Sequence, residues 1–129
     1  MTHVFPVRVY YEDTDLAGIV YYANYLRFIE RARTEWARAA GIDQGRLREE
    51  QGLVFAVRRV EADYLSPARF DDLLEVRTEV EEASGARMVL AQEVRRGEER
   101  VFAARVTLVA LGADGRPRRI PSRLREAGG

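Results

Sequence analysis

Hydrophobic residues alternate with polar ones near the start of the chain and then recur at helical spacing. From Phe5 to Tyr11 every second residue is apolar or aromatic, a pattern that predicts a half-buried β-strand. From Tyr22 to Ala40 the apolar residues recur every three or four positions, which predicts an amphipathic helix of about 18 residues. Gly41 follows directly and is suited to ending that helix.

The second half of the chain is rich in branched and aromatic residues, many of which alternate with charged ones. Turn-forming pairs such as Ser84-Gly85 and Arg96-Gly97 separate these stretches and favour hairpins. A helix with one apolar face needs an apolar surface to cover it, and consecutive hairpin-linked strands supply one. We therefore expect an α+β fold in which an antiparallel sheet wraps around one long helix. The predicted strands cover residues 54–65, 74–81, 88–94 and 101–111, and one further helical turn is expected near residues 46–51.

The last predicted strand, residues 101–111, is apolar at nearly every position. Such a strand is covered on both of its faces, or it lies inside a larger sheet that subunits form by pairing. We therefore expect the protein to be at least a dimer.

Length and composition limit the class of protein. The chain has 129 residues, of which 47% are hydrophobic and 33% are charged, as in an ordinary globular domain. We expect one domain spanning residues 1–129. The sequence lacks an apolar run of the roughly 20 residues that a membrane-spanning helix needs, and its start lacks the pattern of a secretory signal. The expected location is the cytoplasm, without a membrane span.

The charges balance overall but are unevenly distributed. The formal net charge is zero, so a nucleic-acid partner is not favoured. The chain has no lysine; Arg58 and Arg59 are adjacent, and further arginines crowd the C-terminal tail. These arginines form either a solvated surface or a field that steers a phosphorylated ligand. The arginines of the tail are Arg116, Arg118, Arg119, Arg123 and Arg125.

Two residue types that often carry chemistry are nearly absent. The chain has no cysteine, which excludes thiol nucleophiles, disulfides and thiolate metal sites. Its single histidine, His3, lies near the N-terminus, so a Ser-His-Asp triad has no credible base and a histidine-rich metal site has too few ligands. If the protein is an enzyme, its chemistry depends on carboxylates, tyrosines, arginines and the backbone.

Asp15 lies in a short glycine-containing turn between the first predicted strand and the long helix. The start of a helix presents unpaired N–H groups and the positive end of the helix dipole. A carboxylate beside it can attack a carbonyl, or activate water against one, while the N–H groups hold the carbonyl oxygen. The simpler interpretation is a capping or turn-forming aspartate. Together with Asp15, the neighbouring Glu12 and Asp13 provide only three carboxylate side chains, which is too few ligands for a hard cation. We therefore expect structural roles for Glu12 and Asp13.

The order of elements and several motifs resemble the hotdog-fold acyl-CoA thioesterases. The closer similarity is to the 4-hydroxybenzoyl-CoA thioesterase group and, within it, to the family associated with the Tol–Pal cluster. The resemblance covers nearly the whole chain. It is carried by residues 11–15, 18–26, 30–33 and 63–72, which read YEDTD, GIVYYANYL, ERAR and DYLSPARFDD.

This resemblance implies a hotdog fold and hydrolysis of an acyl thioester, with Asp15 as the catalytic carboxylate. It also implies that the backbone at Tyr22 polarises the thioester carbonyl. Members associated with the Tol–Pal cluster usually carry histidine at this position, whereas the 4-hydroxybenzoyl type carries tyrosine. Any role of an imidazole is therefore absent here, but the backbone N–H does not depend on the side chain.

Further residues are expected to contact the substrate, each with a simpler alternative. Gly18 would permit a positive φ or close approach of substrate, or only an ordinary turn. Ile19 and Val20 would wall the acyl channel, or only belong to the core. Asn24 would cap the helix or orient the Asp15 loop. Arg58, Arg59 and the tail arginines are candidates to bind the phosphates of coenzyme A, whereas Glu30 would select a polar acyl group or only pair with Arg27 or Arg33.

The expected partner is an acyl-CoA substrate, no cofactor is expected beyond the coenzyme A of that substrate, and a homodimer is expected to assemble into a homotetramer. Three alternatives remain, of which the last two belong to other classes of protein. A thioesterase could instead act on acyl carrier protein, and a non-catalytic protein could only bind acyl thioesters. A hotdog dehydratase or isomerase would need a histidine-centred site that this sequence lacks.

Overall fold

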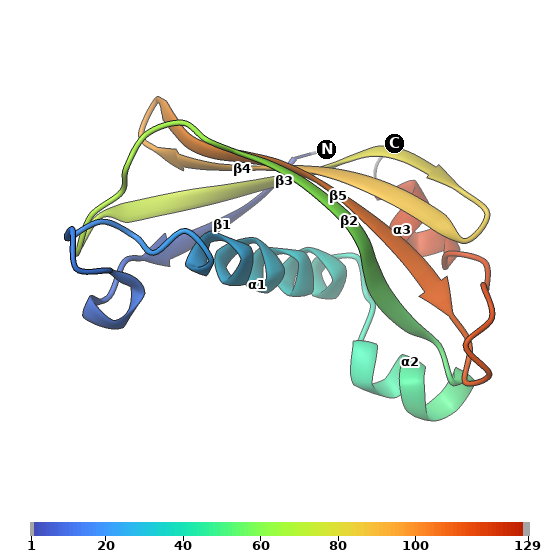
Figure 1. The fold of residues 1–129 in the computed structure, drawn as a ribbon. Helices are drawn as coiled ribbons and strands as arrows, with labels where there is room; N and C mark the ends of the chain where they lie inside the picture. Colours follow the sequence, from blue (N-terminus) through green and yellow to red (C-terminus); the bar gives the residue numbers. More distant parts are fainter. Residues whose placement is uncertain (1, 128–129) are drawn as a thin grey trace.

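The computed structural model describes residues 2–127, which form one antiparallel sheet curved over a long helix (Figure 1). The expected α+β class is therefore confirmed. The strands are β1 (His3–Arg8), β2 (Val54–Tyr64), β3 (Leu73–Ser84), β4 (Arg87–Arg96) and β5 (Glu99–Leu111). The helices are α1 (Asn24–Ala39), α2 (Gln44–Gln51), α3 (Ser122–Glu126) and the short 3₁₀-helix η1 (Tyr11–Asp13).

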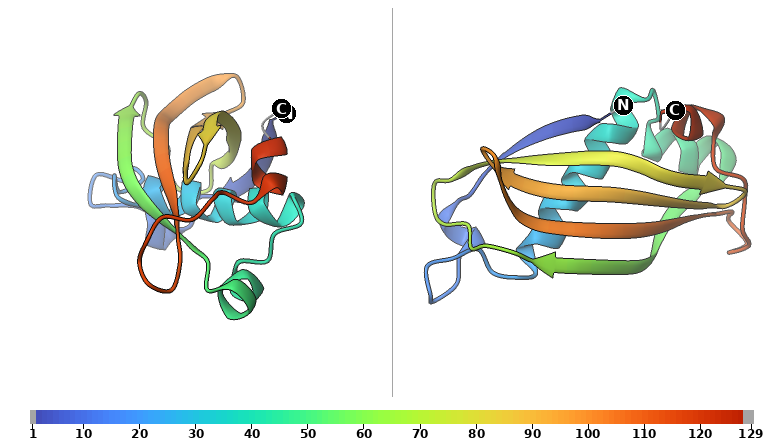
Figure 2. Two further views of the ribbon diagram at one scale, coloured as in Figure 1. Left: turned by 90° about the vertical axis from the view of Figure 1, so that its right-hand side faces the viewer. Right: turned by 90° about the horizontal axis from the view of Figure 1, so that it is seen from above.

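The strand order in the sheet is β1-β3-β4-β5-β2, and every neighbouring pair is antiparallel. Viewed from above, β1 and β2 form the two edges, and α1 crosses beneath the strands (Figure 2, right). Because side chains of a strand point alternately to the two faces, residues such as Val76, Leu90 and Phe102 point toward α1 and are fully buried. Phe28 and Ile29 on the apolar side of α1 are buried against them. This face of the sheet and α1 make up the core.

The first strand is shorter than its alternating pattern predicts. It ends at Arg8, and Tyr11 belongs to η1 with 84% of its surface exposed. The reason is that Val9 exchanges backbone hydrogen bonds with Asp71 and Asp72 of a distant loop. The chain therefore leaves the sheet and turns toward the start of α1.

The long helix begins later than expected, at Asn24 instead of Tyr22. Tyr22 lies in a turn before the helix and is 62% exposed, so placing it on the buried stripe was wrong. Tyr25 and Trp36, which fall on the apolar stripe predicted between Tyr22 and Ala40, are buried. The spacing of apolar residues predicted an earlier start because the aromatic Tyr22 lies at the same helical spacing as the buried residues that follow it.

Strand β5 lies between β4 and β2, so both of its edges are already paired within one chain. The open edge of the sheet next to it is β2. The short helix α3 was not predicted; it buries Leu124, and the segment before it returns to the sheet, where the Ile120 N–H donates to the Gly85 carbonyl.

Candidate active site

The segment before α1 is tied down at both sides by backbone hydrogen bonds. The Val20 N–H donates to the Ala68 carbonyl at 2.8 Å, and the Tyr21 N–H donates to the Asp13 carbonyl at 2.8 Å. Ile19 forms a β-bridge with Arg69. These bonds fix the Asp15 turn against the loop that joins β2 to β3.

Asp13 has an internal, structural role. Its buried carboxylate accepts from the Tyr10 N–H at 2.8 Å and from the Asn24 side-chain amide at 2.9 Å. Both carboxylate oxygens are therefore used. Of the two roles considered for Asn24, the structure places its amide on Asp13, so that it links the first turn of α1 to the loop; no side-chain cap forms.

Asp15 is half-buried, and its two carboxylate oxygens differ in their surroundings. Oδ1 accepts the N–H of Ala17 at 2.9 Å and the N–H of Ile19 at 3.4 Å. No donor to Oδ2 occurs among residues 2–127. These two N–H groups fix the orientation of the carboxylate. One oxygen is thus held while the other remains available for reaction.

The backbone just before α1 provides hydrogen-bond donors close to Asp15. The N–H of Asn24 donates to the Tyr21 carbonyl, whereas the N–H groups of Tyr22 and Ala23 find no acceptor within the described chain. Such unpaired N–H groups are typical of a helix start, where the helix dipole adds partial positive charge.

A cavity of about 410 Å³ joins these features. Asp15, Ile19, Val20 and Tyr22 of the predicted site all line it. The remaining walls come from the start of α1, the end of β2 and the following loop, and they are Tyr21, Tyr25, Tyr64, Leu65, Ser66 and Pro67. The cavity therefore combines one carboxylate, backbone donors and mainly aromatic and apolar walls.

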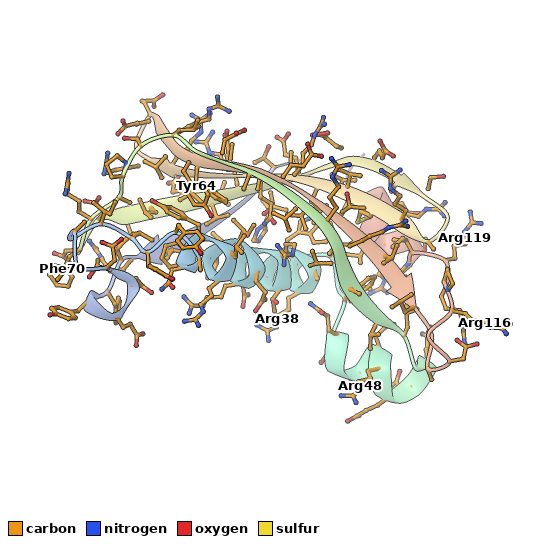
Figure 3. The ribbon with its side chains drawn as sticks, in the orientation of Figure 1. Arg38, Arg48, Tyr64, Phe70, Arg116 and Arg119 are labelled. Atoms are coloured by element: carbon orange, nitrogen blue, oxygen red, sulfur yellow. The ribbon has the colours of Figure 1, made fainter. Side chains whose placement is uncertain are left out.

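Tyr64 was not among the predicted site residues. Its hydroxyl donates to the Tyr22 carbonyl at 3.0 Å, and its ring packs edge-on against Tyr25 and Phe102. Figure 3 shows Tyr64 between the sheet and the first turn of α1. Burial raises the pKa of the Tyr64 hydroxyl, and Tyr22 adds to the effect, so the hydroxyl remains a donor at neutral pH. The only sequence signal for Tyr64 was its place in the 63–72 motif.

Replacing Tyr64 by Phe removes the donor to the Tyr22 carbonyl and keeps the ring. We expect kcat to fall about 2- to 10-fold, the range that one neutral hydrogen bond supports, with KM and the thermal midpoint nearly unchanged. Steady-state kinetics on one acyl-CoA checks this. Tyr10→Phe, which alters an exposed tyrosine outside the cavity, is the matched control. An unchanged kcat for Tyr64→Phe would remove this residue from the site.

Four predicted residues do not line the cavity, and one of them is Asn24, whose side chain binds Asp13 instead. Gly18 has φ of 79°, as expected for its turn, and is exposed beside Asp15. Arg58 and Arg59 lie in the middle of β2, away from its Tyr64 end, at a register shift in the pairing of β2 with β5. The Nε of Arg59 lies 3.5 Å from Oε1 of Glu61. Figure 3 shows Arg116 and Arg119 at the end of the molecule opposite Phe70. One chain by itself therefore does not bring these arginines to Asp15.

The described part of the chain contains no group of three or more His, Cys, Asp or Glu side chains arranged to hold a metal. Within the same residues, none of the helices has the length and apolar character needed to cross a membrane.

Residues 17–103 match the Thioesterase superfamily. Over 92 residues the chain is 53% identical to the acyl-CoA thioesterase YbgC of Haemophilus influenzae, covering 71% of this chain and 68% of that protein. It is 46% identical over 93 residues to the acyl-CoA thioester hydrolase YbgC of Escherichia coli O6:H1, covering 72% and 69%. The crystal structure of a probable thioesterase from Bartonella henselae superposes with a TM-score of 0.90 at 38% identity, covering 94% of this chain and all of that one. The chain thus belongs to the thioesterase superfamily and has its hotdog fold.

Proposed function

We infer that this chain hydrolyses acyl-CoA thioesters to a free acid and coenzyme A, and we propose that Asp15 and the start of α1 form its active site. The similarity to curated acyl-CoA thioesterases supports the reaction. The observation that most supports the site is that Asp15, with one oxygen held and the other available, lines the same cavity as Tyr22.

In the proposed reaction the thioester carbonyl oxygen lies at the N–H groups before α1. These donors and the helix dipole stabilise the negative charge that develops on that oxygen. Oδ2 of Asp15 then attacks the carbonyl carbon to form an anhydride, or removes a proton from the water that attacks it. The C–S bond breaks, and the thiolate leaves with the electron pair. In the first route water then hydrolyses the anhydride to the free acid and restores the Asp15 carboxylate. In both routes the thiolate takes up the proton released from water.

This reaction needs no cofactor, because water and the thioester supply all the atoms. A thiolate is a good leaving group, so a strong general acid is not required. This fits a site whose walls contain no histidine. Coenzyme A enters only as part of the substrate.

Release of thiol from a panel of acyl-CoAs, followed with a disulfide dye, tests the proposed function. Short, long and aromatic acyl groups are compared at equal concentration. Thiol release that requires Asp15 supports the proposal. An acyl carrier protein loaded with the same acyl groups tests the alternative carrier. Binding of acyl-CoA without any thiol release would favour the non-catalytic alternative.

We also propose that the protein acts as a homodimer paired through β2. This 11-residue strand lies at a sheet edge and exposes Val57, Val60 and Tyr64 on it. A long sheet edge with exposed apolar side chains and unpaired backbone groups favours pairing with another strand. Antiparallel pairing of two β2 strands about a two-fold axis would give one continuous sheet with both copies of α1 on the same side.

Such pairing would also bring two different cavities together. The Asp15 cavity lies at the Tyr64 end of β2, and a second cavity lies at the other end, near Phe55 and Val57. In an antiparallel pair the Tyr64 end of one strand lies beside the Val54 end of the other, at the usual spacing of about 4.8 Å. The second cavity of one copy would then adjoin Asp15 of the other copy.

A charge on the proposed contact edge should weaken the dimer. Val60→Lys places two lysines close to the two-fold axis, so we expect dissociation at protein concentrations where the wild type remains paired, with a parallel loss of activity. Sedimentation velocity and thiol release measure the two effects. Val4→Lys, on the opposite edge strand β1, is the matched control because Val4 is similarly exposed. A fully active wild-type monomer at micromolar concentration would contradict the dimer.

We retain a homotetramer of two such dimers and a cytoplasmic location as further proposals. The face of the sheet that points away from α1 supports the homotetramer. This face carries both acidic and basic side chains, such as the pairs of Arg95 with Glu93 and of Arg105 with Glu81. Such a face can meet a second copy with matched charges. The second proposal is supported by the substrate, since acyl-CoA is a metabolite of the cell interior.

A further inference from the structure

A chain of polar groups crosses the core between α1 and the sheet. The Arg33 Nη1 donates to Oε1 of Gln92 at 3.0 Å. The Gln92 amide nitrogen donates to Thr78 Oγ1 at 2.9 Å and to the Ile29 carbonyl at 3.0 Å. Gln92 and Thr78 are buried, and these bonds use both hydrogens of the amide. The orientation of Gln92 is therefore fixed, with its oxygen toward Arg33.

Arg33 is half-buried at the end of this chain, and it forms no ion pair within the described residues. Glu30 is the acidic group that acts on it most, but its carboxylate accepts from the Thr34 hydroxyl at 2.7 Å and is exposed to water. Burial lowers the pKa of Arg33, and Glu30 opposes this only in part. A guanidinium nevertheless keeps its charge in proteins, so the cation lacks a close counter-charge.

The Arg33 side chain lines the second cavity, of about 380 Å³, between α1 and the first half of β2. Its apolar walls include Trp36, Phe55, Val57, Met88, Leu108 and Leu124, and Glu30, Thr34 and Gln44 add polar groups. A cavity of this kind has the features of a small-molecule site, with apolar walls and few polar groups that fix orientation.

We propose that this cavity receives the far end of the acyl group and that Arg33 binds a carboxylate there. The substrates would then be coenzyme A monothioesters of dicarboxylic acids. This inference rests on the proposed function and on pairing through β2, which would set the Arg33 cavity of one copy beside Asp15 of the other. The methylene chain of such a substrate would contact the apolar walls between the two charged ends.

The chemistry of Arg33 favours a carboxylate over a methyl end. A guanidinium binds a carboxylate through two parallel hydrogen bonds, and only one of its nitrogens is engaged by Gln92. A methyl end would leave the cation desolvated without a counter-charge, which is unfavourable. Glu30 also lines the cavity, but water screens its charge more than it screens that of Arg33.

The test compares pairs of thioesters with equal carbon counts: glutaryl-CoA with valeryl-CoA and adipyl-CoA with hexanoyl-CoA. We expect the wild type to have a kcat/KM roughly 10- to 100-fold higher for the dicarboxylic member, and Arg33→Met to abolish that preference. Arg33→Lys keeps the charge but loses the paired geometry, so an intermediate preference is expected. Arg31→Met, on the exposed side of the same helix, is the matched control and should keep the full preference.

The ratio of kcat/KM between the two thioesters of a pair shows whether Arg33 recognises the carboxylate or only supports the fold. A wild type without the preference, or an Arg33→Met that loses activity equally on both members, overturns the inference while hydrolysis itself still stands. A preference for a hydroxyl-ended acyl group over both members would also overturn it. If the wild type releases thiol from none of these thioesters or the wider panel, the proposed function fails instead. Should Arg33→Met not fold, the ratio for Arg33→Lys decides.

Discussion

The Asp15→Asn protein is expected to lose about 10²- to 10⁴-fold of its turnover with acyl-CoA, the contribution typical of a positioned acid or base. The amide oxygen of asparagine can still accept the N–H groups of Ala17 and Ile19, so the turn should keep its shape. What is lost is the negative charge and the reactive second oxygen. Thiol release under saturating substrate measures the effect.

The chain offers a matched control for this substitution. Asp114 also accepts a backbone N–H from the residue two positions later, that of Arg116 at 3.0 Å, but it lies in an exposed turn beyond β5. Asp114→Asn therefore repeats the chemical change in a similar turn without touching the cavity and should leave turnover unchanged. Full turnover by Asp15→Asn would rule out Asp15 as the catalytic carboxylate.

An isotope experiment separates the two roles left open for Asp15. During a single turnover in oxygen-18 water, direct attack followed by hydrolysis of the anhydride can leave label in the aspartate carboxylate. Activation of water puts the label only into the released acid. Mass spectrometry of the peptide that contains Asp15 distinguishes these outcomes.

The second large effect is expected from the backbone N–H of Tyr22 and not from its side chain. Replacing Tyr22 by its α-hydroxy acid turns the amide into an ester and deletes this one donor. We expect kcat to fall by about 10²- to 10³-fold, the loss typical of one oxyanion donor. Tyr22→Ala keeps the N–H, and because the ring is largely exposed, we expect it to keep kcat within about tenfold.

Comparing the loss of kcat in the ester variant with that in Tyr22→Ala separates the backbone N–H from the side chain. Equal losses in the ester and in Tyr22→Ala would assign the effect to the side chain. Full activity of the ester would move the proposed donor to the next N–H, that of Ala23, which also lacks an acceptor in the described chain. Circular dichroism of each variant verifies that α1 still forms.

Several features of the fold could be read directly from the sequence. Alternation and helical spacing depend only on which residues face the core, so they located the sheet and the long helix to within a few residues. The same is true of Asp15 and the helix start, because a turn followed by a helix keeps them close in the chain. The motif around Asp15 and Tyr22 added the family, which the comparisons then confirmed.

Other features depended on contacts between residues distant in the sequence. The end of β1 is set by hydrogen bonds of Val9 to Asp71 and Asp72, and no local pattern signals them. Tyr64 reaches the Tyr22 carbonyl only because the end of β2 lies over the start of α1. Glu30 and Arg33 could have been a simple pair on one helix, yet packing directs Arg33 to Gln92 instead.

Periodicity and local motifs were enough to predict the class of fold, the family and the position of the carboxylate near the helix start. The folded chain was needed to identify the open edge of the sheet, the hydrogen bonds that hold the Asp15 carboxylate and the position of the Arg33 cation. This is because strand order and burial result from contacts across the whole chain, whereas local spacing indicates only whether a side chain faces the core or the solvent.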